Sequence, residues 1–333
     1  MEKSLAYQKL ASTFQRLSRF SHLTSIASWD MFTMMPPGGS AARGEALAEM
    51  SVLQHQILTD KKVGDLLAAA AGEDLNDVEQ ANLREMTRHY QQATLLPESL
   101  VEAKSLAGSR CEHAWRTQRP ANDWQGFSAN LKEVVKLSRE EARLRAEAKG
   151  CTPYDALLDI FEPDMTSARL DVLFCDMQSW LPGLLANVVE KQAQRSFVPP
   201  QGPFPTATQR ELGLEAMKML GLDFNGGRLD VSAHPFCGGV PEDVRITTRY
   251  DEDELLSALF GVIHETGHAR YEQNLPRAWA GQPIALARST AIHESQSLFF
   301  EMQLGRSEAF LKHLLPAVHA RFGSQAAFSE ENF

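Results

Sequence analysis

The chain has 333 residues, of which 43% are hydrophobic and 23% charged. This is the composition of a globular protein, and the length is enough to bury a substantial core. The formal net charge is −10 and there is no block of basic residues, so a nucleic-acid or anionic-membrane partner is not expected.

Cysteine usage and the N-terminus bear on the cellular compartment. Four cysteines are scattered without CxxC spacing, and we expect reduced, mostly buried thiols instead of a disulfide framework. The N-terminal stretch lacks the apolar core of a signal peptide. No run of eighteen apolar residues occurs, so we expect no membrane-spanning segment. These features predict a cytoplasmic protein.

Helical periodicity dominates the first part of the chain, where apolar residues recur every three to four positions. The turn sequence PPGG at 36–39 separates the first two predicted helices. Gly150 is expected to end a long charged helix, and Pro182 to break or kink a later one. The predicted helical segments are 4–30, 42–60, 74–96, 122–150 and 167–195.

The pattern changes between residues 197 and 250, where proline and glycine are frequent. A helix is predicted at 207–222, followed by two short β-like runs. The second run, VRITTRY at 244–250, alternates and is rich in β-branched residues, which predicts a strand.

Helices resume at 251–275, with Asp251 or Asp253 as the expected N-cap. The next helix, 288–305, has Ser289 as its expected cap and Gly305 as its stop, and a last helix is predicted at 307–323. The sequence therefore predicts a mainly α protein with a small β-sheet, forming a single domain over 1–333.

The sequence HETGH at 264–268 indicates a metal site. His264 and His268 are four residues apart, so they share one face of a helix and can reach one tetrahedral metal ion. Glu265 falls beside that ion and suits a general base. The pattern arises by chance in about 2% of chains of this composition. Because it lies here on a predicted helix with an apolar stripe, a metal site is favoured over two packed histidines.

The third metal ligand is expected on the following helix, in the sequence HESQS at 293–297. His293 and Glu294 point about 100° apart around a helix, so both cannot easily bind the ion. Glu294 is favoured because its spacing from His268 is similar to that of zinc peptidases with a glutamate ligand. Gly267 costs a helix about 1 kcal/mol relative to alanine, which suggests that another backbone approaches closely there.

Several stretches together resemble one family, the Taq-type thermostable metallocarboxypeptidases. HETGH and HESQS match its two metal motifs, HPF at 234–236 and DVRIT at 243–247 match two others in the same order, and residues 28–60 resemble its N-terminal segment. The resemblance covers the whole chain. It implies a helical saddle- or clam-like fold with a central groove, a homodimer, and removal of residues from peptide C-termini using zinc or cobalt.

The resemblance also implies roles for individual residues. The metal ligands would be His264, His268 and Glu294, with Glu265 as the base. His234 and Arg245 would lie at the substrate groove.

A carboxypeptidase needs a cation for the free carboxylate of its substrate, and arginine binds carboxylates bidentately. The candidates in the sequence are Arg245, Arg249, Arg270 and Arg288. Arg245 is favoured because it matches the family motif and because of its place on the predicted strand. Alternation along DVRIT places Asp243, Arg245 and Thr247 on one face of the predicted strand, and Pro235 keeps His234 extended.

The chain departs from the family at its C-terminal end. Members continue with an arginine motif of IRxxAD type and a motif of GxxQDxHW type, and neither occurs after residue 306. The chain therefore resembles such an enzyme without its C-terminal third. We expect exposed apolar surface, with low solubility or oligomerisation as the result.

Three functions stay open on the sequence alone. The first is a zinc-dependent metallocarboxypeptidase, and the second is an endo-acting zinc oligopeptidase with the same metal chemistry. The third is a truncated, inactive or weakly active homologue that binds metal.

Overall fold

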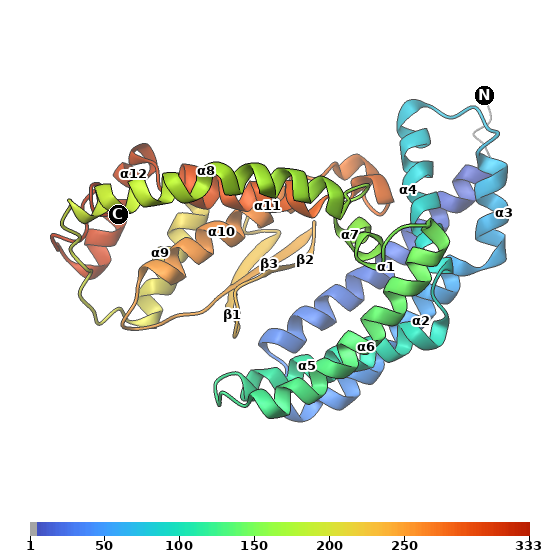
Figure 1. The fold of residues 1–333 in the computed structure, drawn as a ribbon, viewed down its shortest axis with the longest axis horizontal. Coiled ribbons are helices and arrows are strands. Elements are labelled where there is room, and N and C mark those ends of the chain that lie inside the picture. The colour runs from blue at the N-terminus through green and yellow to red at the C-terminus, as the bar shows by residue number, and fades with distance from the viewer. Residues whose placement is uncertain (1–4) are drawn as a thin grey trace. The chain divides into compact units, whose positions relative to one another are not determined.

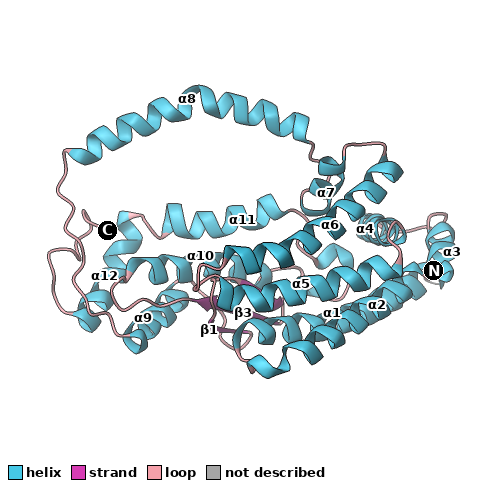
Figure 2. Ribbon diagram, turned by 60° about the horizontal axis from the view of Figure 1, so that its bottom comes forward, coloured by secondary structure: helices cyan, strands magenta, loops and turns pink. Residues whose placement is uncertain are grey.

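The computed structural model describes residues 5–333. Its contacts divide the chain into two compact units, each built from segments that are far apart in sequence (Figure 1). Unit 1 comprises Met1–Leu157, Gly238–Val240 and Asn274–Ala287, and unit 2 the remaining segments. The expectation of a single domain over 1–333 stays a prediction. The predicted class is confirmed, since helices dominate and one small sheet is present (Figure 2).

Unit 1 is helical, and its main core lies among α1, α3 and α4, where Leu10, Phe14 and Met86 are buried. The PPGG sequence forms a short turn after α1, and Gly150 ends α6 with a positive φ of 67°, as predicted. A seventh helix, α7 (Pro153–Phe161), leads into unit 2. The other helices are α1 (Leu5–Thr33), α2 (Ser40–Thr59), α3 (Lys61–Ala70), α4 (Asp77–Thr94), α5 (Glu98–Gln118) and α6 (Trp124–Lys149).

Unit 2 contains the helices and strands that surround HETGH. Three strands form a sheet in the order β1-β3-β2, in which β1 and β3 pair in parallel with Gly227 opposite Val244. The π-helical turn Phe299–Leu304 follows α11 directly. The elements of unit 2 are α8 (Ser167–Ala193), α9 (Thr206–Met219), β1 (Gly227–Val231), β3 (Asp243–Thr248), α10 (Leu256–Gln273), α11 (Thr290–Leu298) and α12 (Glu308–Phe322). Of β2 (Cys237–Val240), residues 238–240 are assigned to unit 1.

The helix α10 lies at the centre of unit 2 because two of its faces are apolar. One face contributes Leu259 and Ile263 to a cluster shared with α9 and α12. A second face contributes Val262 to a cluster with Val244 and Ile246 of β3. The remaining face is polar and carries the two histidines of HETGH, so packing on two sides fixes the orientation of that face.

Several sequence expectations require correction. At the start of α10, the carboxylate of Glu254 accepts from the amides of Leu256 and Ser257, where the carboxylate of Asp251 or Asp253 was expected. Helix α8 continues through Pro182, so the predicted break does not occur, and the alternative of a kink there stays a prediction.

Two of the four cysteines, Cys151 and Cys175, are exposed, and Cys111 and Cys237 are partly exposed, so these thiols are not mostly buried. The cap at Ser289 is confirmed by its bond from the amide of Ile292.

Helix α8 bears on the expectation that no segment spans a membrane, which stays a prediction. It has 27 residues and is apolar and long enough to cross a bilayer, by length and composition alone. None of the residues of this fully described helix is buried. Figure 2 shows it apart from α10, α11 and α12 of the same unit.

Candidate metal centre

The two helices that carry the predicted ligands approach each other closely at Gly267. A Cβ atom on this glycine would lie 2.6 Å from Cα of Ser297 and 2.9 Å from the carbonyl oxygen of Gln296, both on α11. Any side chain there would force α11 away from α10. The expectation of a close backbone approach at Gly267 is therefore confirmed, and it keeps the side chains of the two helices within reach of each other.

The structure brings His264, His268 and Glu294 together. Nε2 of His264 lies 3.6 Å from one carboxylate oxygen of Glu294, and Nε2 of His268 lies 3.4 Å from the other. The potential ligand atoms of the three residues all lie within 4.8 Å of one another. Tetrahedral ligand atoms that are ~2.0–2.1 Å from an ion stand about 3.4 Å apart, so these separations suit a single ion.

The donor set also fits a divalent metal chemically. Two imidazole nitrogens and one carboxylate oxygen are the ligands of many catalytic zinc sites, which keep a fourth position open. The side chain of Glu294 is 46% exposed, whereas those of His264 and His268 are 21% and 14% exposed. The cluster is therefore mostly buried on the side of the two histidines of α10 and open to solvent on the side of the Glu294 carboxylate.

The ring nitrogen of His264 that faces away from the cluster contacts a carboxylate. Nδ1 of His264 lies 3.0 Å from Glu301, on the π-turn. The guanidinium of Arg306 lies 3.0 Å from the other oxygen of Glu301 and 4.1 Å from the centre of the Phe260 ring. Since Nδ1 is engaged in this way, Nε2 is the nitrogen left for a metal.

Behind His268, a second histidine takes the corresponding place. Nδ1 of His268 lies 2.6 Å from Nδ1 of His293, and Nε2 of His293 lies 2.8 Å from Glu272. Both ring nitrogens of His293 are thus engaged, which supports the prediction that Glu294, not His293, is the third ligand.

Glu265 lies between the two histidines in the sequence of α10 and is almost fully buried, at 7% exposure. Burial, and then the nearby charge of Glu294, raise the pKa of Glu265 from 4.5 to about 7. A carboxylate with a pKa near neutrality is suited to accept and release a proton at physiological pH. Burial, followed by the proximity of His293 and His264, lowers the pKa of His268 to about 4, so this imidazole is neutral and free to act as a ligand.

The two predicted substrate residues lie on or near the sheet. Arg245 is on β3, and its guanidinium makes a bidentate pair with Asp243, with N–O distances of 2.8 and 2.6 Å. The predicted alternation along this strand is confirmed by that pair. His234 lies in the exposed loop between β1 and β2, and its carbonyl oxygen accepts from the hydroxyl of Ser232. Their roles toward a substrate stay predictions.

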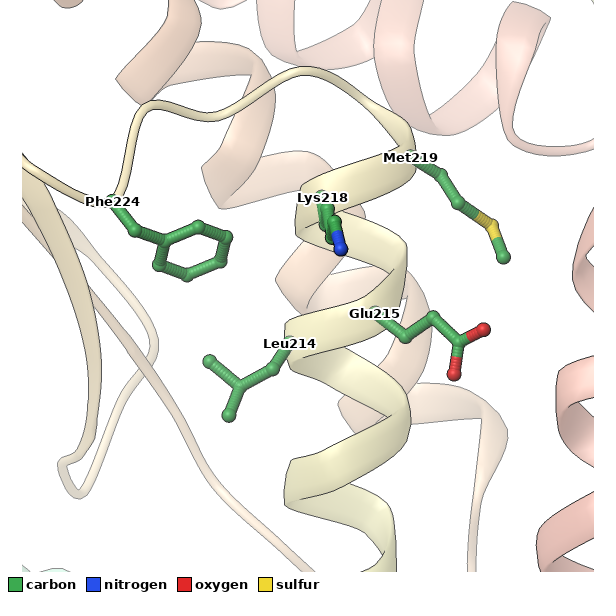
Figure 3. Close-up of a pocket in the computed structure, with 5 residues that line it drawn as sticks. All are labelled: Leu214, Glu215, Lys218, Met219 and Phe224. Atoms are coloured by element: carbon green, nitrogen blue, oxygen red, sulfur yellow. The ribbon is translucent and has the colours of Figure 1, made fainter.

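A surface hollow of about 760 Å³ lies beside α9 (Figure 3). It is lined by Leu214, Glu215, Lys218, Met219 and Phe224, and by none of the predicted site residues. Glu215 is paired with Arg321 at 2.5 Å. The side chains that line the hollow do not form a catalytic group, so the metal cluster is the candidate functional site.

Sequence reasoning missed Glu272 and Glu301, although their spacing held a signal. Glu272 follows His268 by four residues, which continues the stripe of the two histidines along α10. Glu301 follows Glu294 by seven residues, about two helical turns, and so returns to the same face. The role of His293 had no comparable signal, since a helical wheel does not show that it reaches His268 sideways.

Comparison with known proteins gives a consistent result. Residues 9–333 match the model of the family described as carboxypeptidase Taq (M32) metallopeptidase. The chain is 37% identical to thermostable carboxypeptidase 1 of Thermus thermophilus, covering 100% of this chain and 68% of that protein. It is 34% identical to carboxypeptidase 1 of Bacillus subtilis, over 89% of this chain and 59% of the relative.

The fold is also similar to solved structures of carboxypeptidases. The solved structure of metallocarboxypeptidase 1 from Trypanosoma cruzi superposes with a TM-score of 0.89 and 48% identity, covering 98% of this chain and 66% of that one. The chain thus spans 59–68% of the length of these three proteins.

Proposed function

The chain belongs to the carboxypeptidase Taq (M32) metallopeptidase family, and we propose that it removes single residues from the C-termini of peptides with a zinc ion at His264, His268 and Glu294. The observation that carries the proposal is the convergence of the ligand atoms of these three side chains within 4.8 Å, with buried Glu265 next to His264 on α10. Metallopeptidase membership implies a divalent metal. Zinc is proposed because two imidazoles and a carboxylate are its usual catalytic ligands, and cobalt is the alternative.

In the proposed reaction, the metal supplies Lewis acidity and an activated water when it is bound. Glu265 accepts the proton of the attacking water and delivers it to the leaving amine. Its raised pKa of about 7 suits both halves of this transfer, because the group must gain and lose a proton in each cycle. Burial of Glu265 on α10 holds its carboxylate in one orientation.

Recognition of the substrate is proposed for the sheet region. Arg245 would receive the C-terminal carboxylate of the peptide, because a guanidinium binds carboxylates in a bidentate manner. Its present pair with Asp243 has the same geometry that such a substrate would offer. His234 would line the groove, and β3 could add the peptide backbone as a further strand.

The main alternative is a homologue that binds metal but turns over weakly or not at all. The chain spans 59–68% of the length of the three relatives, and the activity of the whole relatives is a proposal for it. Endo-acting cleavage would use the same metal cluster and differ only in where peptides are cut. Homodimer formation, a cytoplasmic location, and the absence of nucleic-acid and membrane partners complete the proposal.

The test is mass spectrometry of an N-blocked peptide incubated with the chain, with and without a chelator. A chelator-sensitive ladder of C-terminal losses is expected. Glu265→Gln should keep zinc and lose the ladder by at least a hundredfold in rate, since general bases contribute about 10²–10⁴-fold.

Glu308→Gln is the matched control, because this carboxylate is 70% exposed on α12. Internal cuts would indicate the endo-acting alternative. A zinc-loaded, folded chain without any cleavage would indicate the metal-binding homologue.

A further inference from the structure

We propose that His293 and Glu272 form a positioning arm for the metal ligand His268, matched on the other ligand by Glu301 and Arg306 behind His264. The inference rests on the proposed function, since it concerns the same metal site. It assigns roles to four side chains that do not contact the ion. The claim is that each ligand histidine is oriented by a hydrogen-bonded chain of its own, and that the two chains differ in chemistry.

The proposed arm behind His268 has one arrangement of protons in which the carboxylate of Glu272 accepts and both contacts are hydrogen bonds. Glu272 is a carboxylate and accepts, so Nε2 of His293, 2.8 Å away, donates. With its proton on Nε2, the proposed tautomer of His293 accepts at Nδ1 from Nδ1 of His268, 2.6 Å away. His268 therefore has its proton on Nδ1 and its lone pair on Nε2, which is the atom that lies 3.4 Å from Glu294. The arm selects the tautomer that can bind a metal.

The arm behind His264 reaches the same result by a shorter path. Glu301 accepts directly from Nδ1 of His264 at 3.0 Å, and Arg306 neutralises it from the far side at 3.0 Å. Arg306 is itself held over the ring of Phe260. Here a carboxylate touches the ligand ring, whereas behind His268 an imidazole intervenes between the ring and the carboxylate.

Helix geometry explains why these four residues can serve both ligands. His264, His268 and Glu272 follow one another at four-residue spacing along α10. On the other chain segment, Glu301 faces His264 while His293 faces His268 and Glu272, so α11 and its π-turn run antiparallel to α10. The absence of a side chain at Gly267 brings the two backbones close enough for these contacts.

The arm also gives a role to His293, which does not belong to the predicted ligand set. His293 is adjacent to the ligand Glu294, and its side chain is only 22% exposed. Both of its ring nitrogens are bonded, and its ring packs 4.9 Å from that of Tyr271. A histidine held from three directions has a fixed orientation, which a positioning residue requires. Groups that orient metal-binding histidines typically contribute 10–100-fold to metal affinity.

The experiment measures the zinc affinity of the whole chain by competition with a fluorescent chelator. We expect His293→Phe to weaken zinc binding by 10–100-fold, because the ring is retained in size but can no longer accept from His268. His293→Asn should restore most of that loss, since its carbonyl oxygen stands near the position of Nδ1. The control is His313→Phe, which changes an exposed histidine of α12 and should leave zinc affinity unchanged.

The melting temperature of the metal-free protein separates positioning from a structural role. A positioning role predicts that His293→Phe lowers zinc affinity while the metal-free chain melts within a few degrees of the wild type. Equal zinc affinity in His293→Phe and wild type would overturn the proposal. So would a loss of affinity that Asn does not restore and that is accompanied by a large fall in metal-free melting temperature.

Failure of the proposed function would be recognised before any variant is compared. A folded wild-type chain that takes up no zinc would overturn the metal site, and this inference with it. A wild-type chain that binds zinc without cleaving peptides would overturn only the proposed catalysis, and the zinc affinities would still test the arm.

Discussion

Helices α10 and α8 of unit 2 are both rich in apolar residues but have opposite environments. Nine of the 18 residues of α10 are buried, including Leu259, Val262 and Ile263. The 27 residues of α8, all of them described, include no buried one. Leu184 and Leu185 of α8 are 51% and 60% exposed. Apolar composition alone therefore does not determine whether a helix in this chain has a core to pack against.

The difference shows what makes α10 suitable for a metal site. Because two faces of α10 are packed, its third face cannot rotate, and the ligands on it keep their direction. Helix α8 has no packed face of this kind, and its large apolar side chains are exposed. The expected exposed apolar surface is thus present on α8, within the region that matches the longer relatives.

The largest expected effect is on the free energy of unfolding, which we compare for one truncated side chain on each helix. Ile263→Ala, at a fully buried position of α10, should lower the free energy of unfolding by about 3 kcal/mol, because it leaves a cavity. Leu184→Ala on α8 should change it by less than about 0.5 kcal/mol. Urea denaturation of the metal-free chain measures both. Similar losses in the two variants would mean that α8 is packed in solution, and the comparison would no longer hold.

The next effect concerns the ligand opposite α10. Glu294→Ala should weaken zinc binding at least a hundredfold, about 2.7 kcal/mol, since it removes one of three protein ligands. Calorimetric titration of zinc into the metal-free chain gives the affinity. Glu330→Ala, at a carboxylate outside the cluster, serves as the control. Undiminished affinity in Glu294→Ala would remove this residue from the metal site.

Two glycines of α10 test the approach of α11. Gly267→Ala should destabilise the chain by about 1–3 kcal/mol, because the new Cβ would overlap Ser297. Gly261→Ala is the matched control, since nothing lies within 4 Å of its Cβ, and it should stabilise by up to about 1 kcal/mol. Thermal unfolding distinguishes them. A stabilising Gly267→Ala would show that α11 is free to move away.

The pH dependence of stability tests the burial of Glu265. Its pKa is raised to about 7, so its contribution is complete below pH 4.5 and is lost as pH rises through 7. The pKa of His268 is lowered to about 4, so its contribution is present above pH 6.5 and is lost as pH falls through 4. The two slopes therefore oppose each other between pH 4.5 and 6.5.

Glu265→Gln should remove the first slope and leave the second. In metal-free protein, the stability of the variant should rise with pH more steeply than that of the wild type in this window, by about 1 kcal/mol per pH unit. Urea midpoints across pH 4.5–6.5 measure the difference. Parallel profiles would mean that Glu265 titrates as an exposed carboxylate does.

The smallest effect on stability, but a clear effect on association, is expected on α8. Leu184→Glu combined with Leu185→Glu should change the unfolding free energy by less than about 0.5 kcal/mol while reducing self-association of the chain. Light scattering over a range of protein concentrations measures the mass. Leu23→Glu, at a residue of α1 that is 62% exposed, controls for the added charge. A wild-type chain that stays monomeric at all concentrations would contradict the prediction.

Much of unit 2 could be predicted from local sequence signals. Helical spacing identified α10, the HETGH stripe placed two histidines on one face, and the cost of Gly267 correctly indicated a close neighbour. Capping at Ser289 followed from its side chain. The contact of Glu254 at the start of α10 did not, because glutamate uncommonly caps a helix and two aspartates stand nearby.

What the sequence could not supply depends on contacts between distant elements. Periodicity shows that α8 is apolar but not that it lacks a partner, because burial depends on the rest of the fold. The helical wheel of α11 shows that His293 and Glu294 cannot easily both bind one ion, but it does not show that the His293 ring reaches His268. The continuation of α8 through Pro182 likewise depends on local backbone adjustment that a propensity scale does not contain.

The absent side chain at Gly267 also has a consequence for recognising such sites from sequence. The usual pattern HExxH leaves two positions open, but here the second open position is restricted by the backbone of α11. Glycine makes up 21 of the 333 residues, so a pattern that demands it would match by chance about sixteen times less often in a chain of this composition. Where a second ligand helix packs this closely, the pattern HExGH identifies such a site more specifically than HExxH does.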